Sequence, residues 1–219
     1  MRPHLTIRWL LALSLCLSAT AGAQAGIRAP GWKVVFDRAG IPDSAANMGA
    51  MAPGWHVSTL PGAPGAITFD PANVGARTFR LESEMIFFGS ASGAGAGLVI
   101  AGRGLDTPGP RFVAFTVYPD GRYAVIRMTG ATRETLVTPT TDAAIARHPG
   151  GNVQVKHVLS LEGDDRTVTF KVNGTKVASL PRAVVDPGGV VGLRLEPGVN
   201  VHIATFLLDG KNAAPVPTR

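Results

Sequence analysis

Two acidic residues in the first half of the chain have a spacing that could support hydrolytic chemistry. Glu82 and Glu84 lie two positions apart in a segment, residues 77–88, whose apolar and polar residues alternate as in a β-strand. Residues two apart on a strand project from the same face, so the two carboxylates would be neighbours. A pair of carboxylates about 5 Å apart is the arrangement that retaining glycosidases use. Arg80 would share their face, and a solvated row of paired charges is the alternative interpretation.

A second candidate site is a set of lysines in residues 153–180, which are predicted to form three antiparallel strands. Apolar and polar residues alternate throughout this segment. Asn173-Gly174 is typical of a two-residue hairpin turn, because both residues tolerate the positive φ that the turn requires. With a further turn at 162–165, three lysines would lie side by side on the solvent face: Lys156, Lys171 and Lys176. Like charges directly opposed are unfavourable, so the row is either an anion-binding face or a solvated sheet exterior.

The opposite face of these three strands is apolar and is expected to be buried. Its one titratable residue, His157, is predicted to be a core histidine with a hydrogen-bond partner and not a metal ligand. The other histidines have no spacing typical of zinc ligands, so the sequence predicts no metal site and no cofactor. Trp55 and Tyr123 are candidates for stacking on sugar rings, with core packing as the alternative.

The N-terminus has the features of a secretory signal peptide. Arg2 and Arg8 flank the start of an apolar run at 9–17 that is too short to cross a bilayer. Small residues at 21–25 match the pattern that signal peptidase cuts. Removal of residues 1–25 is therefore expected, with the protein periplasmic or secreted. The single cysteine of the 219 residues lies in the apolar run, so the mature chain would depend on core burial without disulfides.

The charge of the chain restricts its partners. The formal net charge is +6, and removal of the signal peptide would lower it by two. The chain has no basic run of the kind that marks nucleic-acid binding, and no later apolar stretch approaches membrane length. We therefore expect no nucleic acid and no membrane span. A glycan, in particular an acidic one, or another component of the cell-envelope surface is the expected partner.

Short strands separated by turns dominate the rest of the chain. With 17 proline and 27 glycine residues and one candidate helix, at 142–147, the pattern predicts an all-β antiparallel sandwich or jelly roll. A single domain is predicted over residues 26–210, followed by a short tail at 211–219. Besides the segments named above, strands are predicted at 32–37, 55–60, 66–69, 98–100, 111–118, 122–128, 133–138, 190–196 and 199–208.

Several segments resemble the strands of concanavalin A-like sandwich domains, the fold of lectins and glucanases. The resemblance rests on residues 78–85, 95–100, 112–123, 168–174 and 190–193. Within that superfamily the sequence is most similar to the laminin-G-like and 3-keto-disaccharide hydrolase domains of exported bacterial proteins. The acidic segment and the Trp-Asn pair that the hydrolases carry are missing here. The strand with Glu82 and Glu84 also lacks the Asp and third acid of the glucanase pattern Glu-x-Asp-x-x-Glu.

The sequence thus predicts an exported, non-catalytic β-sandwich that binds carbohydrate or another surface component. The expected ligand-binding residues are Lys156, Lys171, Lys176, Arg80, Trp55 and Tyr123. One alternative is a glycoside hydrolase of the 3-keto-disaccharide type, which the resemblance implies, with Glu82 and Glu84 as its acids. The other alternative is a structural protein-interaction module of the envelope.

Overall fold

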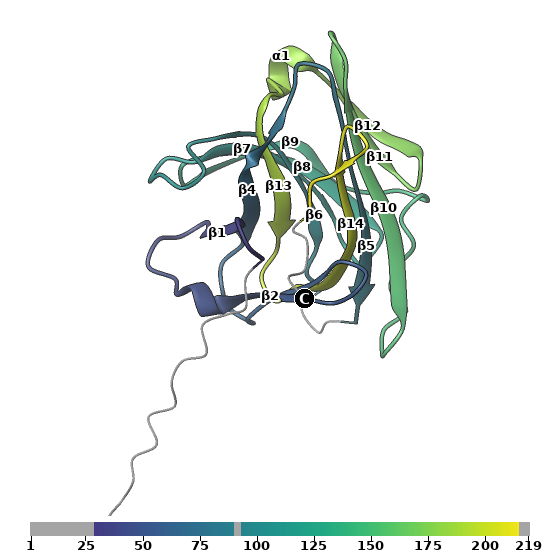
Figure 1. The fold of residues 1–219 in the computed structure, drawn as a ribbon. Helices are drawn as coiled ribbons and strands as arrows, with labels where there is room; N and C mark the ends of the chain where they lie inside the picture. The colour runs from purple at the N-terminus through teal and green to yellow at the C-terminus, as the bar shows by residue number, and fades with distance from the viewer. Residues whose placement is uncertain (1–28, 90–92, 215–219) are drawn as a thin grey trace, which may run out of the picture.

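The computed structural model describes residues 29–89 and 93–214, which form two antiparallel sheets packed face to face (Figure 1). The predicted all-β antiparallel sandwich is confirmed. The predicted signal peptide, residues 1–25, lies outside the described residues, as do positions 215–219 of the predicted tail. No helix in the described part of the chain is long and apolar enough to cross a membrane.

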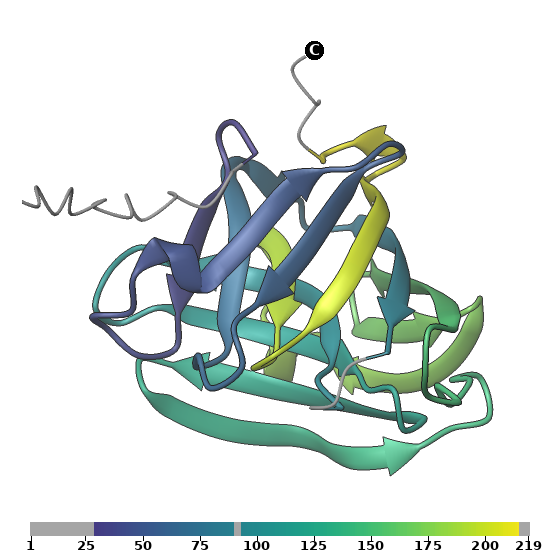
Figure 2. The same ribbon diagram turned by 90° about the horizontal axis from the view of Figure 1, so that it is seen from below.

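The seven-stranded sheet has the order β1 (Lys33–Phe36), β4 (Ala66–Gly75), β13 (Gly189–Leu195), β6 (Ala96–Arg103), β7 (Arg111–Val117), β8 (Arg122–Thr129) and β9 (Thr132–Thr141). The eight-stranded sheet has the order β12 (Thr175–Pro181), β11 (Thr167–Val172), β10 (Gln154–Gly163), β5 (Phe79–Phe88), β14 (Asn200–Leu208), β3 (Trp55–Thr59) and β2 (Ala46–Ala50), with β15 (Lys211–Asn212) added beside β14. Figure 2 shows the strands of one sheet crossing those of the other at an angle. Within residues 29–89 and 93–214 the helical segments are a 3₁₀ turn at Asp43–Ala45 and the short α1 at Arg182–Val185.

The main hydrophobic core lies between the two sheets, because alternate residues of each strand point inward. On β5 every second residue is buried, as the alternation in residues 77–88 predicts: Phe79, Leu81, Ser83, Met85 and Phe87. Phe115 of the seven-stranded sheet packs against Phe170 of the eight-stranded sheet in an edge-to-face arrangement, with ring centroids 5.4 Å apart. Burial of each such side chain stabilises the fold by about 1.5–3 kcal/mol.

A smaller apolar cluster covers part of the outer face of the seven-stranded sheet. Phe69, Phe112 and Met128 belong to it, and Leu105 from the connection after β6 folds over them. Asp106, the next residue in that connection, accepts a hydrogen bond from Lys33 of β1 at 2.6 Å. This face is therefore partly closed by the chain itself.

The β7–β8 hairpin has the register that its turn implies, whereas the β11–β12 hairpin has the expected register only next to its turn. In the β7–β8 hairpin Phe115 pairs with Val125 and Val117 pairs with Tyr123. In the β11–β12 hairpin Asn173 and Gly174 both have positive φ, 51° and 79°, and Val172 pairs with Thr175. An irregularity between Phe170 and Lys171 then shifts the pairing by one residue, so that Phe170 lies opposite Ala178. These pairings place apolar residues of both hairpins in the main core.

The turn between β10 and β11 differs from the prediction at 162–165. β10 continues through Gly163, and the Asp164 carboxylate accepts hydrogen bonds at 2.7 Å from the main-chain N–H groups of Arg166 and Thr167, which closes a tighter turn. The predicted turn would have paired Leu159 with Val168, but Leu159 pairs with Val172 and the register is shifted by four residues. An even shift leaves every side chain on its predicted face but changes its neighbours.

The predicted row of three lysines is therefore wrong. Lys171 lies opposite Lys176, as expected, but its partner on β10 is Ser160. Lys156 lies farther along β10, opposite Ile86 of β5. Each of Lys156 and Lys171 contacts a carboxylate, and only Lys171 and Lys176 remain neighbours across strands.

Two further segments differ from prediction. Residues 142–147 form a turn and no helix, because the Asp142 carboxylate accepts a hydrogen bond from the N–H of Ala144 at 2.8 Å and ends the turn locally. Residues 46–50, where no strand is predicted, form the edge strand β2 beside β3. Its alternation is short and includes Gly49, which weakens the sequence signal.

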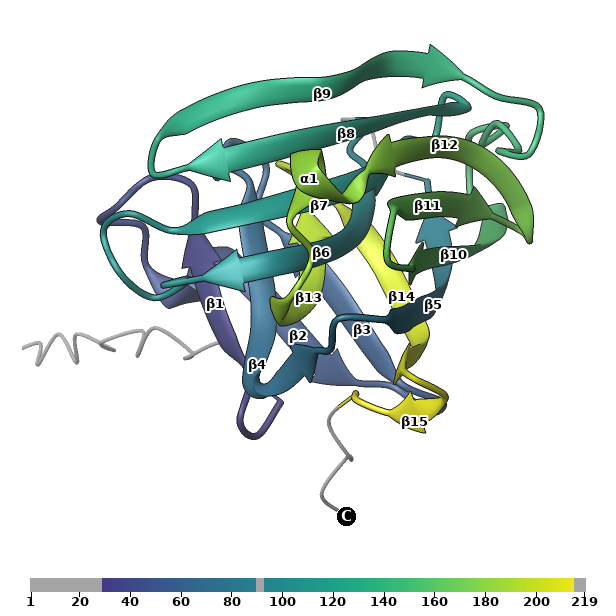
Figure 3. The ribbon, with the colours of Figure 1, turned by 90° about the horizontal axis from the view of Figure 1, so that it is seen from above.

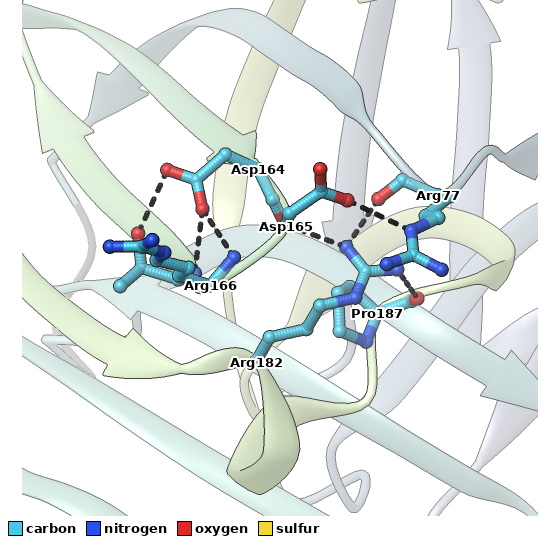
Figure 4. A network of polar contacts seen from close by, with 7 residues as sticks. Arg77, Asp164, Asp165, Arg166, Arg182 and Pro187 are labelled. Carbon is cyan, nitrogen blue, oxygen red and sulfur yellow. Dashed lines mark hydrogen bonds and ion pairs between the residues drawn. The ribbon is translucent and has the colours of Figure 1, made fainter.

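Arg182, the first residue of α1, ties together one end of the sandwich (Figure 4). Its guanidinium donates to the main-chain oxygens of Arg77, of Asp164 at 2.9 Å and of Pro187 at 3.4 Å. The Arg77 side chain in turn donates to Asp165 at 2.9 Å. The β4–β5 connection, the β10–β11 turn and α1 are thereby held against one another.

Candidate functional site

The outer face of the eight-stranded sheet carries a connected set of charged side chains, which we call the charge ladder. Its members come from four adjacent strands: Arg80, Glu82 and Glu84 of β5, Lys156 and Glu162 of β10, Lys171 of β11 and Lys176 of β12. The members on β5, β10 and β11 project away from the core because they alternate with more buried residues, and Lys176 shares their face because it lies directly opposite Lys171. The structure thus brings the predicted lysines, Arg80 and both predicted acids onto one face.

Ion pairs connect most of the charge ladder. Lys171 contacts Glu162 at 2.6 Å, Glu162 contacts Arg80 at 3.5 Å, and Arg80 contacts Glu82 at 2.7 Å. Lys156 forms a separate pair with Glu84 at 3.3 Å. The hydrogen bond and the charge of Glu82 raise the pKa of Arg80. The side chains therefore hold one another in place along the sheet.

A shallow cleft of about 340 Å³ adjoins the charge ladder. Arg80 and Glu82 form its polar side, and Leu207 and Gly210 from the β14–β15 hairpin form its apolar side. The guanidinium is a donor only and the ionised carboxylate is an acceptor only, so together they match hydroxyl groups, which do both. A polar pair beside an apolar side chain is typical of small-molecule sites, and it suits a sugar ring, which has hydroxyl edges and C–H faces.

The geometry does not add a catalytic partner to Glu82 and Glu84. Both carboxylates are engaged in ion pairs, with Arg80 and Lys156. The neighbours of Glu82 across the sheet are Ser160 and Leu207, so no further acid stands beside it in the register. The arrangement is that of the solvated row of paired charges which the sequence left as the alternative.

The predicted stacking residues lie inside the protein. Trp55 is 3% exposed and Tyr123 is 5% exposed, and both belong to the main core. The Tyr123 hydroxyl donates to the main-chain oxygen of Val177 at 2.6 Å, which satisfies its polar end. Their side chains present no face to solvent on which a sugar ring could stack, so core packing is the correct interpretation.

A buried arginine on the outer face of the seven-stranded sheet was not foreseen from the sequence. Arg194 of β13 is 1% exposed and donates two hydrogen bonds of 2.6 Å to Asp37 and one of 3.1 Å to Glu196. Burial would lower the pKa of Arg194, but the hydrogen bonds and charges of the two acids outweigh it and raise the pKa. A Cβ atom at Gly65 would lie 2.2 Å from this guanidinium, so the site requires glycine there.

Histidines that are far apart in sequence meet on the eight-stranded sheet. His56 of β3 lies directly opposite His202 of β14, whose Nε2 is 2.7 Å from the Pro53 oxygen. Burial, followed by the nearby His202, lowers the pKa of His56. The two histidines meet only because β3 pairs with β14, so their spacing in the sequence could not predict the contact. Among residues 29–89 and 93–214, no three His, Cys, Asp or Glu side chains are placed to hold a metal ion.

The sequence matches no known protein family and no curated protein. The fold is similar to that of the carbohydrate-binding module CBM66 from Bacillus subtilis, with 12% identity and a TM-score of 0.59 over 83% of this chain and 96% of that one. A Bacillus subtilis protein of unknown function with a galectin-like fold matches with 10% identity and a TM-score of 0.59, over 85% of this chain and 90% of that one. The Bacteroides ovatus mixed-linkage glucan GH16 protein, in complex with product, matches with 11% identity and a TM-score of 0.55, over 80% of this chain and 94% of that one.

These similarities confirm the predicted class, a jelly-roll sandwich of the concanavalin A-like type. At such low identity they show the shared fold and carry no residue of a known site to this chain.

Proposed function

We propose that this protein is an exported, non-catalytic carbohydrate-binding domain whose glycan-contacting surface is the charge ladder with its adjoining cleft. The observation that carries the proposal is the placement of Arg80, Glu82 and Leu207 around one exposed cleft on a rigid sheet face. Side chains that are already held in place lose little conformational entropy on binding, which favours binding of a ligand that makes few contacts. The shared fold with a carbohydrate-binding module supports the class of ligand.

The charge balance of this surface favours neutral sugars over strongly acidic ones. Three of its four cations contact a carboxylate within 3.3 Å, and Lys176 is the fourth. Salt screens interactions between exposed charges that are not in contact, so binding here should depend on salt only weakly. This differs from the expectation that three adjacent lysines would attract an acidic polysaccharide.

The proposal is tested with an array of neutral and acidic oligosaccharides, followed by calorimetry on any glycan that binds. Arg80→Gln should weaken binding about ten-fold, the loss expected for one charge-assisted hydrogen bond. Arg77→Gln is the matched control, because Arg77 also forms an exposed ion pair, with Asp165 at 2.9 Å, but does not line the cleft. Equal losses in both variants, or hydrolysis of a 3-keto-glycoside that Glu82→Gln abolishes, would contradict the proposal.

Export is the second part of the proposal, supported by the leader-like pattern of residues 1–25. It is tested by expressing the full chain and sequencing the N-terminus of the exported product. Cleavage at positions 23–25 is expected. A product that retains Arg2 and stays in the cytoplasm would refute export and leave the glycan assay unaffected.

A further inference from the structure

We propose that an arginine-rich cleft at the α1 end of the sandwich is a second ligand site, which binds the carboxylate of a uronic acid residue. The cleft has a volume of about 250 Å³ and lies between α1 and residues of β6, β7 and β8. Figure 3 looks onto this end and shows α1 in front of the strands of the seven-stranded sheet. None of the charge ladder residues lines it, so the two sites are separate.

Three arginines line the cleft, and their arrangement is costly for a purely structural surface. Arg103 of β6 lies directly opposite Arg111 of β7, a pairing of like charges that destabilises a sheet. Arg127 of β8 lies beside them, opposite Val113. Acidic partners offset part of this repulsion, and an anion bound at Arg111 would offset the rest.

Two of the three guanidinium groups already have acidic partners. Arg103 contacts Asp186 at 2.8 Å, and Arg127 contacts Glu134 at 2.7 Å. Arg111 forms no ion pair with any residue in the described part of the chain. The cleft therefore retains one net positive charge, which matches a singly charged ligand group better than a dianion.

The chemistry of Arg111 favours a planar carboxylate. A guanidinium can donate two parallel hydrogen bonds to the two oxygens of a carboxylate, which adds orientation to the charge attraction. Val113 lines the cleft two residues along β7 from Arg111 and on the same face of the strand, so one apolar side chain accompanies the guanidinium.

The cleft is held in shape by contacts of α1. Arg127 donates to the main-chain oxygen of Val184, and Val185 is buried in the main core. The Arg182 contacts of Figure 4 anchor the start of the same helix. At about 250 Å³ the cleft is just below the range of roughly 300–1000 Å³ that holds drug-sized ligands. It therefore suits a single sugar unit and not a long chain.

The assignment of the carboxylate to a sugar rests on the proposed carbohydrate binding, whereas the anion site itself rests on the arginines alone. The test is a titration of the ¹⁵N-labelled protein with sodium glucuronate, followed by amide chemical shifts. Shifts are expected in the main chain around Arg111, Arg127 and 183–186, and glucose at the same concentration should leave these amides unchanged.

Variants of Arg111 make the test specific. Arg111→Gln should weaken glucuronate binding at least ten-fold, because a charge-assisted bidentate contact is lost. Arg111→Lys should also weaken glucuronate binding, because lysine keeps the positive charge but cannot donate two parallel hydrogen bonds to the carboxylate. Arg38→Gln is the matched control, an exposed arginine outside both clefts, and should bind as the unaltered protein does. The amide spectrum itself reports whether each variant is folded.

The alternative outcomes separate the two proposals. Glucuronate affinity that survives in folded Arg111→Gln, or equal binding of glucose, overturns the anion site. Sulfate that binds as tightly as glucuronate overturns the preference for a carboxylate, and glutamate that does so overturns its assignment to a sugar. If no neutral glycan binds at the charge ladder while glucuronate still binds at Arg111, only the function proposed for the charge ladder is refuted.

Discussion

The buried Arg194 provides the sharpest test of how the sandwich is held together. Replacing it with alanine would leave the carboxylates of Asp37 and Glu196 facing each other without their cation. Removing one partner of a buried ion pair costs about 3–5 kcal/mol. Asp37 and Glu196 are 24% and 12% exposed, so some hydration remains and we expect about 3 kcal/mol.

Arg122→Ala is the matched control, because its pair with Asp120 has the same 2.6 Å separation but is about half exposed on both sides. Exposed pairs contribute about 0–1 kcal/mol, so burial alone would account for the difference. Urea unfolding of the two variants measures the free energies, with the slope m as the check that the two-state description holds. The triple variant Arg194→Met, Asp37→Asn, Glu196→Gln should recover most of the loss, since it leaves no uncompensated charge.

Equal losses in Arg194→Ala and Arg122→Ala would refute this reasoning. So would a triple variant as unstable as Arg194→Ala, because the cost would then arise from lost packing volume and not from the unpaired acids.

Two further predictions concern the main core. Burial, opposed by a hydrogen bond to the Ala146 main chain, lowers the pKa of His157, so the unfolded chain takes up a proton at a higher pH than the folded one. The free energy of unfolding should therefore be highest above about pH 6.5 and fall as the pH drops below that value. His157→Gln should make this fall shallower in urea midpoints measured from pH 7 to 5. A pH dependence that the variant leaves unchanged would contradict the assignment. Phe170→Ala should cost about 3–5 kcal/mol in the same assay, because it removes a fully buried ring between the sheets, and a loss below 1 kcal/mol would be inconsistent with the packing described.

The alternation of apolar residues was enough to predict the fold class and which face of each strand is buried. Phe79, Leu81, Met85 and Phe87 are inward as predicted, and Arg80, Glu82 and Glu84 are outward. These assignments depend only on the two-residue period of a strand, so they survive an even shift of register. The β10–β11 pair shows this, because its four-residue shift leaves Leu159 and Phe170 in the core.

Features that depend on which residues are neighbours across strands could not be predicted in the same way. The lysine row failed because the turn begins at Asp164, whose carboxylate binds two main-chain N–H groups and extends β10 beyond Glu162. Arg194 and Asp37 are 157 positions apart, and no local pattern links them. The arginine cleft likewise depends on the Arg103–Arg111 register and on where α1 lies.

Calorimetry with an oligosaccharide selected on the array measures whether the charge ladder binds glycan. We expect binding that is weakened about ten-fold by Arg80→Gln and unchanged by Arg77→Gln. Silence across the array, or an affinity that Arg80→Gln leaves intact, would contradict it.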